Sequence, residues 1–433
     1  MIFLYRLLFL PALLVAAPYY LWRMHRRGGY SDGFWHRFGG VPELPAKRPG
    51  VRRIWLQAVS VGEMLAISPL LEAFRHDKSV EIYLTTTTST GYKLALEKYR
   101  DWTVGLGYFP LDFWAFSSRA WRHVQPDLAI LMEGERWPEH LRQAQQRGVP
   151  VLCINARMSD RSWRRLHRFR RILPALSVGI TRLAAAAKRD EQRFRALGIS
   201  TGNLETSGNL KLDVKIPLLP DDEKVRLRRE LGLGNGLVLL GSSTWAGEES
   251  ALLLTLRVAR ERGLKVSLLI VPRHAERRGE LRALLEKSGL RFHFRSEGPA
   301  PGEVDVTVAD TTGELRRLTQ LADLVFVGKS LAPHDGGQTP VEAAILGKPI
   351  LHGPRMTNFR EIVRTLKETG ATRMVDNHSV LVAAAVELLQ DAAQREKMAV
   401  AARAWADVNR GATERTLAII RTELDKRTVS GVR

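Results

Sequence analysis

The sequence predicts an α/β protein of two doubly wound domains, each with a parallel sheet that helices cover on both faces. Three observations predict this fold. Short apolar runs alternate with amphipathic helical patterns along most of the chain, as in successive strand–helix–strand units. The 433 residues are enough for two domains of ordinary size. The alternation stops in a charged stretch at residues 213–235 and then starts again, so we expect a linker there.

In the first half, the apolar runs predict strands that lead into helices. The expected strands span residues 54–61, 80–86, 128–132, 149–154 and 183–187, and the expected helices include residues 63–75 and 189–197. Cys153, the single cysteine of the chain, lies in one of these strands. We therefore expect a packed thiol rather than a nucleophile.

The second half repeats the alternation and ends on helices from about residue 380. Its expected strands span residues 237–240, 266–271, 304–309, 324–327 and 349–352. The expected organisation is a membrane anchor at 1–27, an N-terminal domain at 28–212, the linker at 213–235 and a C-terminal domain at 236–433. Ligands of doubly wound sheets bind beyond the carboxyl ends of the strands, so we expect the active site in the cleft between the domains.

The N-terminal segment is almost wholly apolar over residues 2–21, with Arg6 and Pro11 as interruptions, and a basic cluster follows Trp22. Roughly 20 apolar residues suffice for a membrane helix, and basic residues beside an aromatic favour the cytoplasmic side. In a cleaved signal peptide the basic residues would precede the apolar run. We expect an uncleaved anchor in the inner (cytoplasmic) membrane, with the catalytic body on the cytoplasmic face. Whether it spans the bilayer or lies in the interface is open.

The formal net charge of +20 favours anionic partners. Nothing in the chain matches a nucleic-acid motif, so a nucleic-acid partner is not expected. One basic stretch, residues 161–171, places Trp163, Leu166 and Phe169 at helical spacing among arginines. This stretch predicts either a solvated helix with its aromatics in the core or a helix against anionic lipid headgroups.

One candidate site is the Ser-x-x-Glu stretch after the first expected strand. Ser60, Gly62 and Glu63 lie where a strand passes into a helix, where Gly62 permits a sharp turn and Ser60 can cap the helix. The spacing is that of a capping box, which needs no function. A carboxylate at the end of a strand is equally well placed as a general base, and both interpretations are open.

A second candidate site follows the expected strand at residues 128–132. Glu133 and Glu135 precede Trp137 and Pro138, and two carboxylates so close disfavour each other's charge. They could orient an acceptor hydroxyl. The structural alternative is an ion pair with Arg136 beside a helix that begins at Pro138.

The second half carries groups suited to an anion, all after expected strands. Arg273 can grip a phosphate with two hydrogen bonds, and turns that open helices offer free N–H groups. These groups are Pro272 and Arg273, then Thr312, Gly313 and Glu314, and then Thr339, Pro340, Val341 and Glu342. Each piece is also ordinary turn chemistry, but their shared place predicts a nucleotide-sugar site. Lys211, near the linker, could contact the donor's carboxylate or phosphate, or be a solvated lysine. No metal-ligand cluster is present, so no metal or cofactor is expected.

Taken together and in order, the motifs resemble those of the bacterial transferases that move 3-deoxy-D-manno-octulosonic acid (Kdo) from its CMP conjugate to a lipid A precursor. The resemblance covers nearly the whole chain. Its motifs are AVSVGE at 58–63, EGERWP at 133–138, NARMS at 155–159, GNLKLD at 208–213, GEE at 247–249, PRH at 272–274, DTTGEL at 310–315 and GG at 336–337.

The resemblance implies a GT-B fold, with an acceptor domain first and a donor domain second, and it implies that Glu63 is the general base. It places CMP on Pro272 and Arg273, on the turn at 312–314 and on residues 339–342. We add Glu133 as a second catalytic carboxylate, Ser60, Gly62 and Glu135 as acceptor-binding residues, and Lys211 as donor-binding. The expected partners are CMP-Kdo, a lipid A precursor and inner-membrane lipids.

The sequence also departs from the family pattern. Lys329 stands where the family has the second glycine of Gly-Gly-Ser, Trp245 where it has a histidine, and Thr339 where it has an asparagine. Two alternatives therefore stay open beside Kdo transfer in lipopolysaccharide synthesis. One is a GT-B transferase or epimerase that uses a UDP sugar, and the other is a weakened paralogue that binds lipid or protein.

Overall fold

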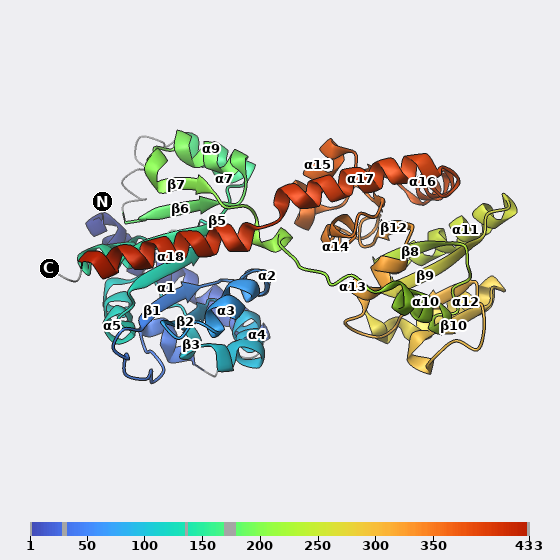
Figure 1. Cartoon of the computed structure of the whole chain (residues 1–433). Coiled ribbons are helices and arrows are strands. Elements are labelled where there is room, and N and C mark those ends of the chain that lie inside the picture. The colour runs from blue at the N-terminus through green and yellow to red at the C-terminus, as the bar shows by residue number, and fades with distance from the viewer. Residues whose placement is uncertain (1, 28–32, 135–136, 169–178, 431–433) are drawn as a thin grey trace. The chain divides into compact units, whose positions relative to one another are not determined.

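The structure, a computed structural model, describes residues 2–27, 33–134, 137–168 and 179–430. It divides into two compact units, which Figure 1 shows in the colours of the chain. Unit 1 comprises Met1–Asp213 and Gly411–Arg433, and unit 2 comprises Val214–Arg410. Each unit is an α/β body built on one parallel sheet, as the alternation of strands and helices predicts.

Unit 1 contains a seven-stranded sheet in the order β3-β2-β1-β4-β5-β6-β7. The strands are β1 (Arg52–Gln57), β2 (Val80–Thr86), β3 (Gly105–Tyr108), β4 (Leu128–Met132), β5 (Val151–Ala156), β6 (Arg182–Ala185) and β7 (Leu204–Thr206). Its helices are α1 (Ile2–Arg27), α2 (Val61–Ala66), α3 (Ser68–Arg75), α4 (Ser89–Tyr99), α5 (Trp114–Val124), α6 (Pro138–Gln146), α7 (Asp160–Arg168), α9 (Lys188–Ala196) and α18 (Ala412–Ser430). Every residue of β4 is buried, because a parallel sheet is covered on both faces.

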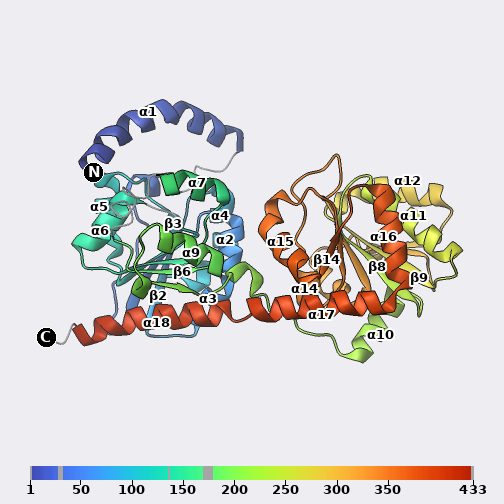
Figure 2. The ribbon, with the colours of Figure 1, turned by 90° about the horizontal axis from the view of Figure 1, so that it is seen from above.

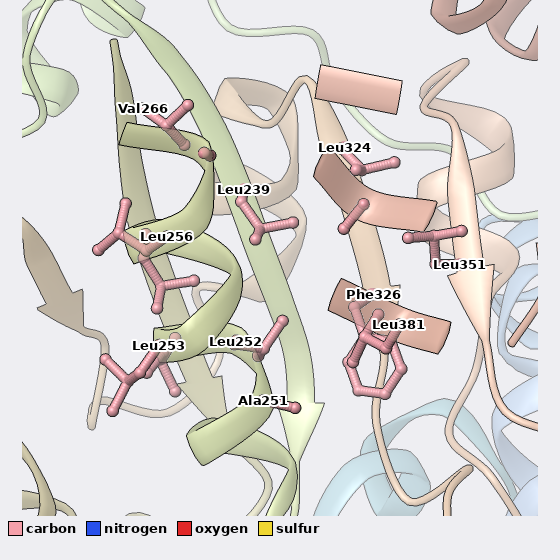
Figure 3. Close-up of a cluster of buried hydrophobic side chains, with 14 of the residues drawn as sticks. Leu239, Ala251, Leu252, Leu253, Leu256, Val266, Leu324, Phe326, Leu351 and Leu381 are labelled. Carbon is pink, nitrogen blue, oxygen red and sulfur yellow. The ribbon is translucent and has the colours of Figure 1, made fainter. Parts of the chain in front are cut away.

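Unit 2 repeats this architecture with the order β10-β11-β9-β8-β12-β13-β14. The strands are β8 (Leu237–Thr244), β9 (Val266–Pro272), β10 (Phe292–Phe294), β11 (Val306–Val308), β12 (Leu324–Val327), β13 (Ile350–His352) and β14 (Thr372–Met374). Its helices are α10 (Asp221–Glu230), α11 (Glu248–Glu261), α12 (Arg278–Ser288), α13 (Leu315–Leu318), α14 (Val341–Ile345), α15 (Arg360–Thr369), α16 (His378–Gln390) and α17 (Ala392–Asn409). Figure 3 shows Leu252 of α11, Leu239 of β8 and Phe326 of β12 in one buried cluster between helix and sheet.

In each sheet the chain crosses from one side of its first strand to the other, and this switch point positions the candidate sites. In unit 1, β2 pairs with one side of β1, and the chain then returns so that β4 pairs with the other side of β1. In unit 2 the same reversal places β12 beside β8. Such switch points open a crevice outside the carboxyl ends of the two central strands.

The boundaries of the units differ from those expected at residues 213–235 and 236–433. The final helix, α18, belongs to unit 1, where Ala412, Ile419 and Ile420 join its hydrophobic core. Part of the expected linker forms α10, whose Leu227 is buried in unit 2. The apolar stripe of α18 and the single apolar positions of α10 were too weak a signal to assign either helix to a domain.

Local differences have simple physical reasons. The helix expected at residues 63–75 is split at Ile67 into α2 and α3, because Pro69 at the start of α3 lacks the N–H that would continue the first helix. The strands β3, β7, β10 and β14 were not predicted. Three of them have only three residues, and β3 contains two glycines, so none gives a clear strand pattern.

The N-terminal segment forms the long helix α1, which Figure 2 shows on the outside of unit 1. Near its beginning, Arg6 donates two hydrogen bonds to the buried carboxylate of Glu139, at 2.7 and 2.8 Å. Tyr5 donates one at 2.6 Å to Asp112. Among the described residues, none of the helices is both long and apolar enough to cross a membrane.

The basic stretch at residues 161–171 falls partly within α7. Trp163 and Leu166 pack against a buried cluster that includes Phe194, so for these two residues the structure favours a solvated helix with its apolar side chains on the core. Phe169 lies outside the described residues.

Candidate active site

Glu63 lies in the first turn of α2, the helix that follows the carboxyl end of β1 after a short turn. Ser60 caps the helix by accepting a hydrogen bond from the backbone N–H of Glu63 at 3.3 Å. The Glu63 carboxylate accepts hydrogen bonds from the backbone N–H of Val59 at 2.8 Å and from the Ser60 hydroxyl at 3.1 Å. The helix cap is therefore formed, and it also holds the Glu63 carboxylate in a defined orientation.

The surroundings of Glu63 change its acidity. The residue is only 6% exposed, and this burial raises the pKa of its carboxyl group above the ordinary value. The hydrogen bond from Val59 opposes the rise, the charge of Glu133 adds to it, and the Lys211 ammonium opposes it. A carboxylate whose pKa lies nearer to neutral pH is a better general base than an ordinary one.

Glu133 and Lys211 form an ion pair beside Glu63. Glu133 follows β4, the strand next to β1, and has a left-handed backbone with φ of 56°. The Lys211 Nζ lies 2.5 Å from the Glu133 Oε1. A Cβ placed on Gly62 would lie 4.0 Å from the same ammonium. Within unit 1, Lys211 is therefore grouped with the carboxylates of Glu63 and Glu133, and its expected contact with the sugar donor stays a prediction.

Other side chains, which sequence reasoning missed, hold this group in place. Asn155 lies near the end of β5, where its backbone is left-handed, and it is fully buried. Its Oδ1 accepts a hydrogen bond from the backbone N–H of Leu210 at 3.0 Å, which fixes the turn that carries Lys211. The hydroxyls of Thr86, Thr87 and Thr88 all donate to the carbonyl of Val59, at 3.0, 3.4 and 3.0 Å. The run of threonines at the end of β2 is the feature of the sequence from which these hydrogen bonds could have been inferred.

The remaining candidates of unit 1 are only partly described. Glu135 and Arg136 lie outside the described residues. Trp137 packs on Phe109 with ring centroids 5.4 Å apart, and α6 begins at Pro138 as expected.

In unit 2, the residues expected to bind the sugar donor lie at the end of β9 and in the segments that follow β11 and β12. The backbone N–H of Arg273, directly after β9, donates to the carbonyl of Thr244 at the end of β8, at 3.1 Å. His274 meets the ring of Trp245 edge-on, with centroids 5.1 Å apart. The carboxyl end of the sheet therefore brings together Pro272, Arg273 and the end of β8.

An ion pair connects the two other segments that are expected to bind the sugar donor, residues 312–314 and 339–342. Arg316, just after the turn of Thr312, Gly313 and Glu314, lies 3.7 Å from Glu342. Glu314 itself is 3.6 Å from Arg295. In the second segment, the hydroxyl of Thr339 accepts a hydrogen bond from the backbone N–H of Val341 at 3.2 Å, with Pro340 as the residue that caps α14. The second oxygen of Glu342 is buried without a hydrogen-bond partner in the described chain.

The glycine turn at residues 336–337 lies over the end of β12. The backbone N–H of Gly337 donates to the carbonyl of Lys329 at 3.0 Å. Gly337 has a φ of 68°, and a Cβ there would collide with the sulfur of Met356, so only glycine fits. Across the described ranges, no group of three or more His, Cys, Asp and Glu side chains is arranged to hold a metal ion.

Comparisons with known proteins identify the family. Residues 32–214 match the family model described as 3-deoxy-D-manno-octulosonic-acid transferase (kdotransferase). A protein of Bordetella pertussis named 3-deoxy-D-manno-octulosonic acid transferase is 32% identical over 417 residues, which cover 92% of this chain and 94% of that protein. This chain belongs to the Kdo transferase family. A Haemophilus influenzae protein of the same name is 32% identical and covers 97% of the chain and 96% of its own length.

Solved structures place the Kdo transferase chain among two-domain α/β proteins. A UDP-GlcNAc 2-epimerase of Neisseria meningitidis matches 86% of the chain and 100% of its own with a TM-score of 0.56. A putative UDP-N-acetylglucosamine 2-epimerase of Listeria monocytogenes matches 87% of the chain and 97% of its own, also with a TM-score of 0.56. Both are 15% identical, so they show a common, GT-B-like fold alone. The family makes the chain a glycosyltransferase.

Proposed function

We propose that this glycosyltransferase moves Kdo from CMP-Kdo to a lipid A precursor, with Glu63 as the general base. The family membership supports the type of reaction, and the contacts of Glu63 support its role as the general base. Its carboxylate is oriented by Val59 and Ser60, has a raised pKa because it is buried, and follows a central strand at the switch point of the sheet. These are the properties that proton abstraction from a hydroxyl requires.

The proposed step is a single displacement at the anomeric carbon of Kdo. Glu63 accepts the proton of the acceptor hydroxyl as that oxygen forms the new glycosidic bond. The bond from the anomeric carbon to the phosphate oxygen breaks, and CMP leaves with the electron pair, so the configuration at that carbon inverts. Lys211 favours the ionised form of Glu63, since its ammonium opposes the rise in pKa that burial causes.

The acceptor would be bound by unit 1 and the nucleotide by unit 2. Ser60, Gly62 and Glu133 surround Glu63 and are the groups proposed to position the acceptor, together with Glu135. In unit 2, Arg273 and the turns at residues 312–314 and 339–342 offer a guanidinium and backbone N–H groups. Fixed charge and dipoles of this kind stabilise the negative charge that develops on the departing phosphate.

We also propose that α1 lies in the interface of the inner (cytoplasmic) membrane. Large apolar side chains are exposed along α1: Phe3, Leu7, Leu14, Val15, Tyr19 and Trp22. Arg6 and Tyr5 connect the same helix to the rest of unit 1 through hydrogen bonds to Glu139 and Asp112. A helix held to the body on one side and apolar on the other suits insertion among lipid headgroups, where a lipid A precursor would be met.

Vesicle binding tests this location. The full chain should sediment with vesicles of phosphatidylethanolamine and phosphatidylglycerol. The double variant Leu7→Ser and Leu14→Ser should bind several-fold less, since each change removes about 1–3 kcal/mol of apolar burial. The matched control is Leu218→Ser with Val225→Ser, which alters exposed residues of unit 2. Equal binding by both double variants would remove α1 from this role.

The reaction itself is tested by mass spectrometry of the lipid product. The chain is incubated with a lipid A precursor and either CMP-Kdo or UDP-GlcNAc. The proposal expects a mass increase of one or more Kdo residues with CMP-Kdo alone. An added N-acetylglucosamine, or no addition with either donor, would rule the proposal out.

A further inference from the structure

Trp245 and Lys329 lie at the carboxyl ends of β8 and β12, the two central strands at the switch point of unit 2. One carboxylate holds both backbones. Glu248, which is fully buried, accepts hydrogen bonds from the backbone N–H groups of Trp245 at 3.0 Å, Lys329 at 2.9 Å and Ser330 at 3.0 Å. The backbone of Lys329 has a φ of 58°, a conformation that a lysine adopts only when its surroundings impose it.

This arrangement places the Lys329 side chain on an aromatic face. Its Nζ is 4.6 Å from the centroid of the Trp245 ring, within the range of a cation–π contact. A Cβ on Gly336 would lie 3.7 Å from the same nitrogen, so the ammonium also borders the glycine turn. His274 and His334 flank the Trp245 ring, with centroids 5.1 and 5.3 Å from it.

The side chains around Trp245 and Lys329 include hydrogen-bond donors that have no acceptor among the described residues. Within the described part of the chain, no carboxylate forms an ion pair with Lys329. The hydroxyl of Thr244, a residue with no exposed surface, and the indole Nε1 of Trp245 are buried without a hydrogen-bond partner there. An ammonium, an indole N–H and a hydroxyl all lack the same thing, an acceptor oxygen. Buried polar groups such as this hydroxyl and this indole N–H are rarely left in this state, and an oxyanion at the half-buried ammonium of Lys329 would give that charge a partner.

We propose that Lys329, held on the face of Trp245, binds an oxyanion of the donor, and specifically the carboxylate of its sugar. The inference rests on the proposed function, because Kdo is an acid and CMP-Kdo therefore carries a carboxylate beside its phosphate. Arg273, directly after the neighbouring strand β9, remains available to bind the phosphate. The Trp245 ring excludes water from one side of the ammonium, which strengthens the attraction between the opposite charges.

Kinetics with four variants test the subsite. Lys329→Met removes the charge, Lys329→Arg keeps it, Trp245→Leu removes the aromatic face, and Lys287→Met is the matched control on the exposed face of α12. A charge-assisted hydrogen bond of ordinary strength corresponds to about 10- to 100-fold in affinity. Lys329→Met should raise the KM for CMP-Kdo by that factor, Trp245→Leu by less, and Lys329→Arg and Lys287→Met should stay near the wild type.

Inhibition by CMP separates the two oxyanions. CMP has the phosphate and no carboxylate, so its inhibition constant should be the same for Lys329→Met and the wild type. An equal weakening of CMP and CMP-Kdo would assign the oxyanion to the phosphate and overturn the carboxylate assignment. Unchanged values for both ligands would overturn the subsite, provided that the wild type transfers Kdo. A wild type without transfer contradicts the proposed function instead. Equal melting temperatures of Lys329→Met and Lys287→Met exclude misfolding as the cause.

Discussion

The ammonium of Lys211 lies 2.5 Å from the carboxylate of Glu133, which stands 78 residues earlier in the chain. This ion pair places one positive and one negative charge near the buried carboxylate of Glu63, and the two charges act on the acidity of Glu63 in opposite directions. The acidity of the proposed base is therefore set by its neighbours as well as by its burial, and this has consequences for the dependence of the reaction on pH.

Lys211→Met and Glu133→Gln should move the acidic limb of the kcat/KM profile in opposite directions. A general base works when it is ionised, so activity rises as pH rises through the pKa of Glu63. The raised pKa of Glu63 places this limb above the pH expected of an ordinary carboxyl group. Without the Lys211 charge the limb should shift to higher pH, and without the Glu133 charge to lower pH.

The control for these shifts is Lys93→Met, which removes an exposed lysine of α4. Its profile should coincide with that of the wild type. Shifts of Lys211→Met and Glu133→Gln in the same direction would show that the two charges do not act through Glu63.

Arg6→Met should destabilise unit 1 through Glu139. The Glu139 side chain is fully buried, whereas that of Arg6 is 25% exposed. The variant leaves a buried charge without its partner, and we expect it to cost about 2 kcal/mol, less than for a wholly buried pair. Urea unfolding should therefore show a lower midpoint. Adding Glu139→Gln to Arg6→Met should restore much of the loss, because the second change removes the stranded charge.

An exposed arginine of α5 supplies the comparison for this experiment. Arg119→Met should unfold at the wild-type midpoint. If Arg6→Met did the same, the contact between α1 and the rest of unit 1 would contribute nothing to stability.

Asp213→Ala should loosen the final helix. The chain leaves unit 1 at Asp213 and returns to it at Gly411. The Asp213 carboxylate connects the two points, because it accepts hydrogen bonds from the backbone N–H groups of Gly411 at 3.0 Å and Thr413 at 2.6 Å. Loss of such a helix cap costs roughly 0.5–2 kcal/mol. Limited trypsin digestion should release residues after 411 faster from Asp213→Ala than from Asp213→Asn, which keeps one acceptor oxygen. Identical digestion of wild type and both variants would contradict this account of the cap.

Much of the fold could be predicted from the sequence because buried parallel strands are continuous apolar runs, as in β4 and β9. The same reasoning correctly predicted that Glu63, Glu133 and Arg273 follow strands of parallel sheets, and their roles stay predictions. The position of α18 could not be predicted, because its return to unit 1 depends on contacts with residues more than 200 positions earlier, such as the hydrogen bond from Arg415 to Ser207.

The contacts within the candidate sites were also beyond the sequence. The role of Lys211 in donor binding stays a prediction, and its contact with Glu133 depends on the turn that Asn155 fixes through Leu210. Trp245 and Lys329 were separate departures from the family pattern. That one packs on the other follows only from the crossover that brings β12 beside β8.

The most direct test of the proposed chemistry is the transfer rate of Glu63→Gln. The amide keeps an oxygen for the hydrogen bond from Val59, so the variant should fold and bind CMP as the wild type does. It cannot accept the proton, and the account predicts a loss of about 10²–10⁴-fold in the rate of Kdo addition measured by mass. Glu97→Gln, at an exposed position of α4, should keep the full rate. A Glu63→Gln enzyme that transfers Kdo at nearly the wild-type rate would contradict the assignment of Glu63 as the base.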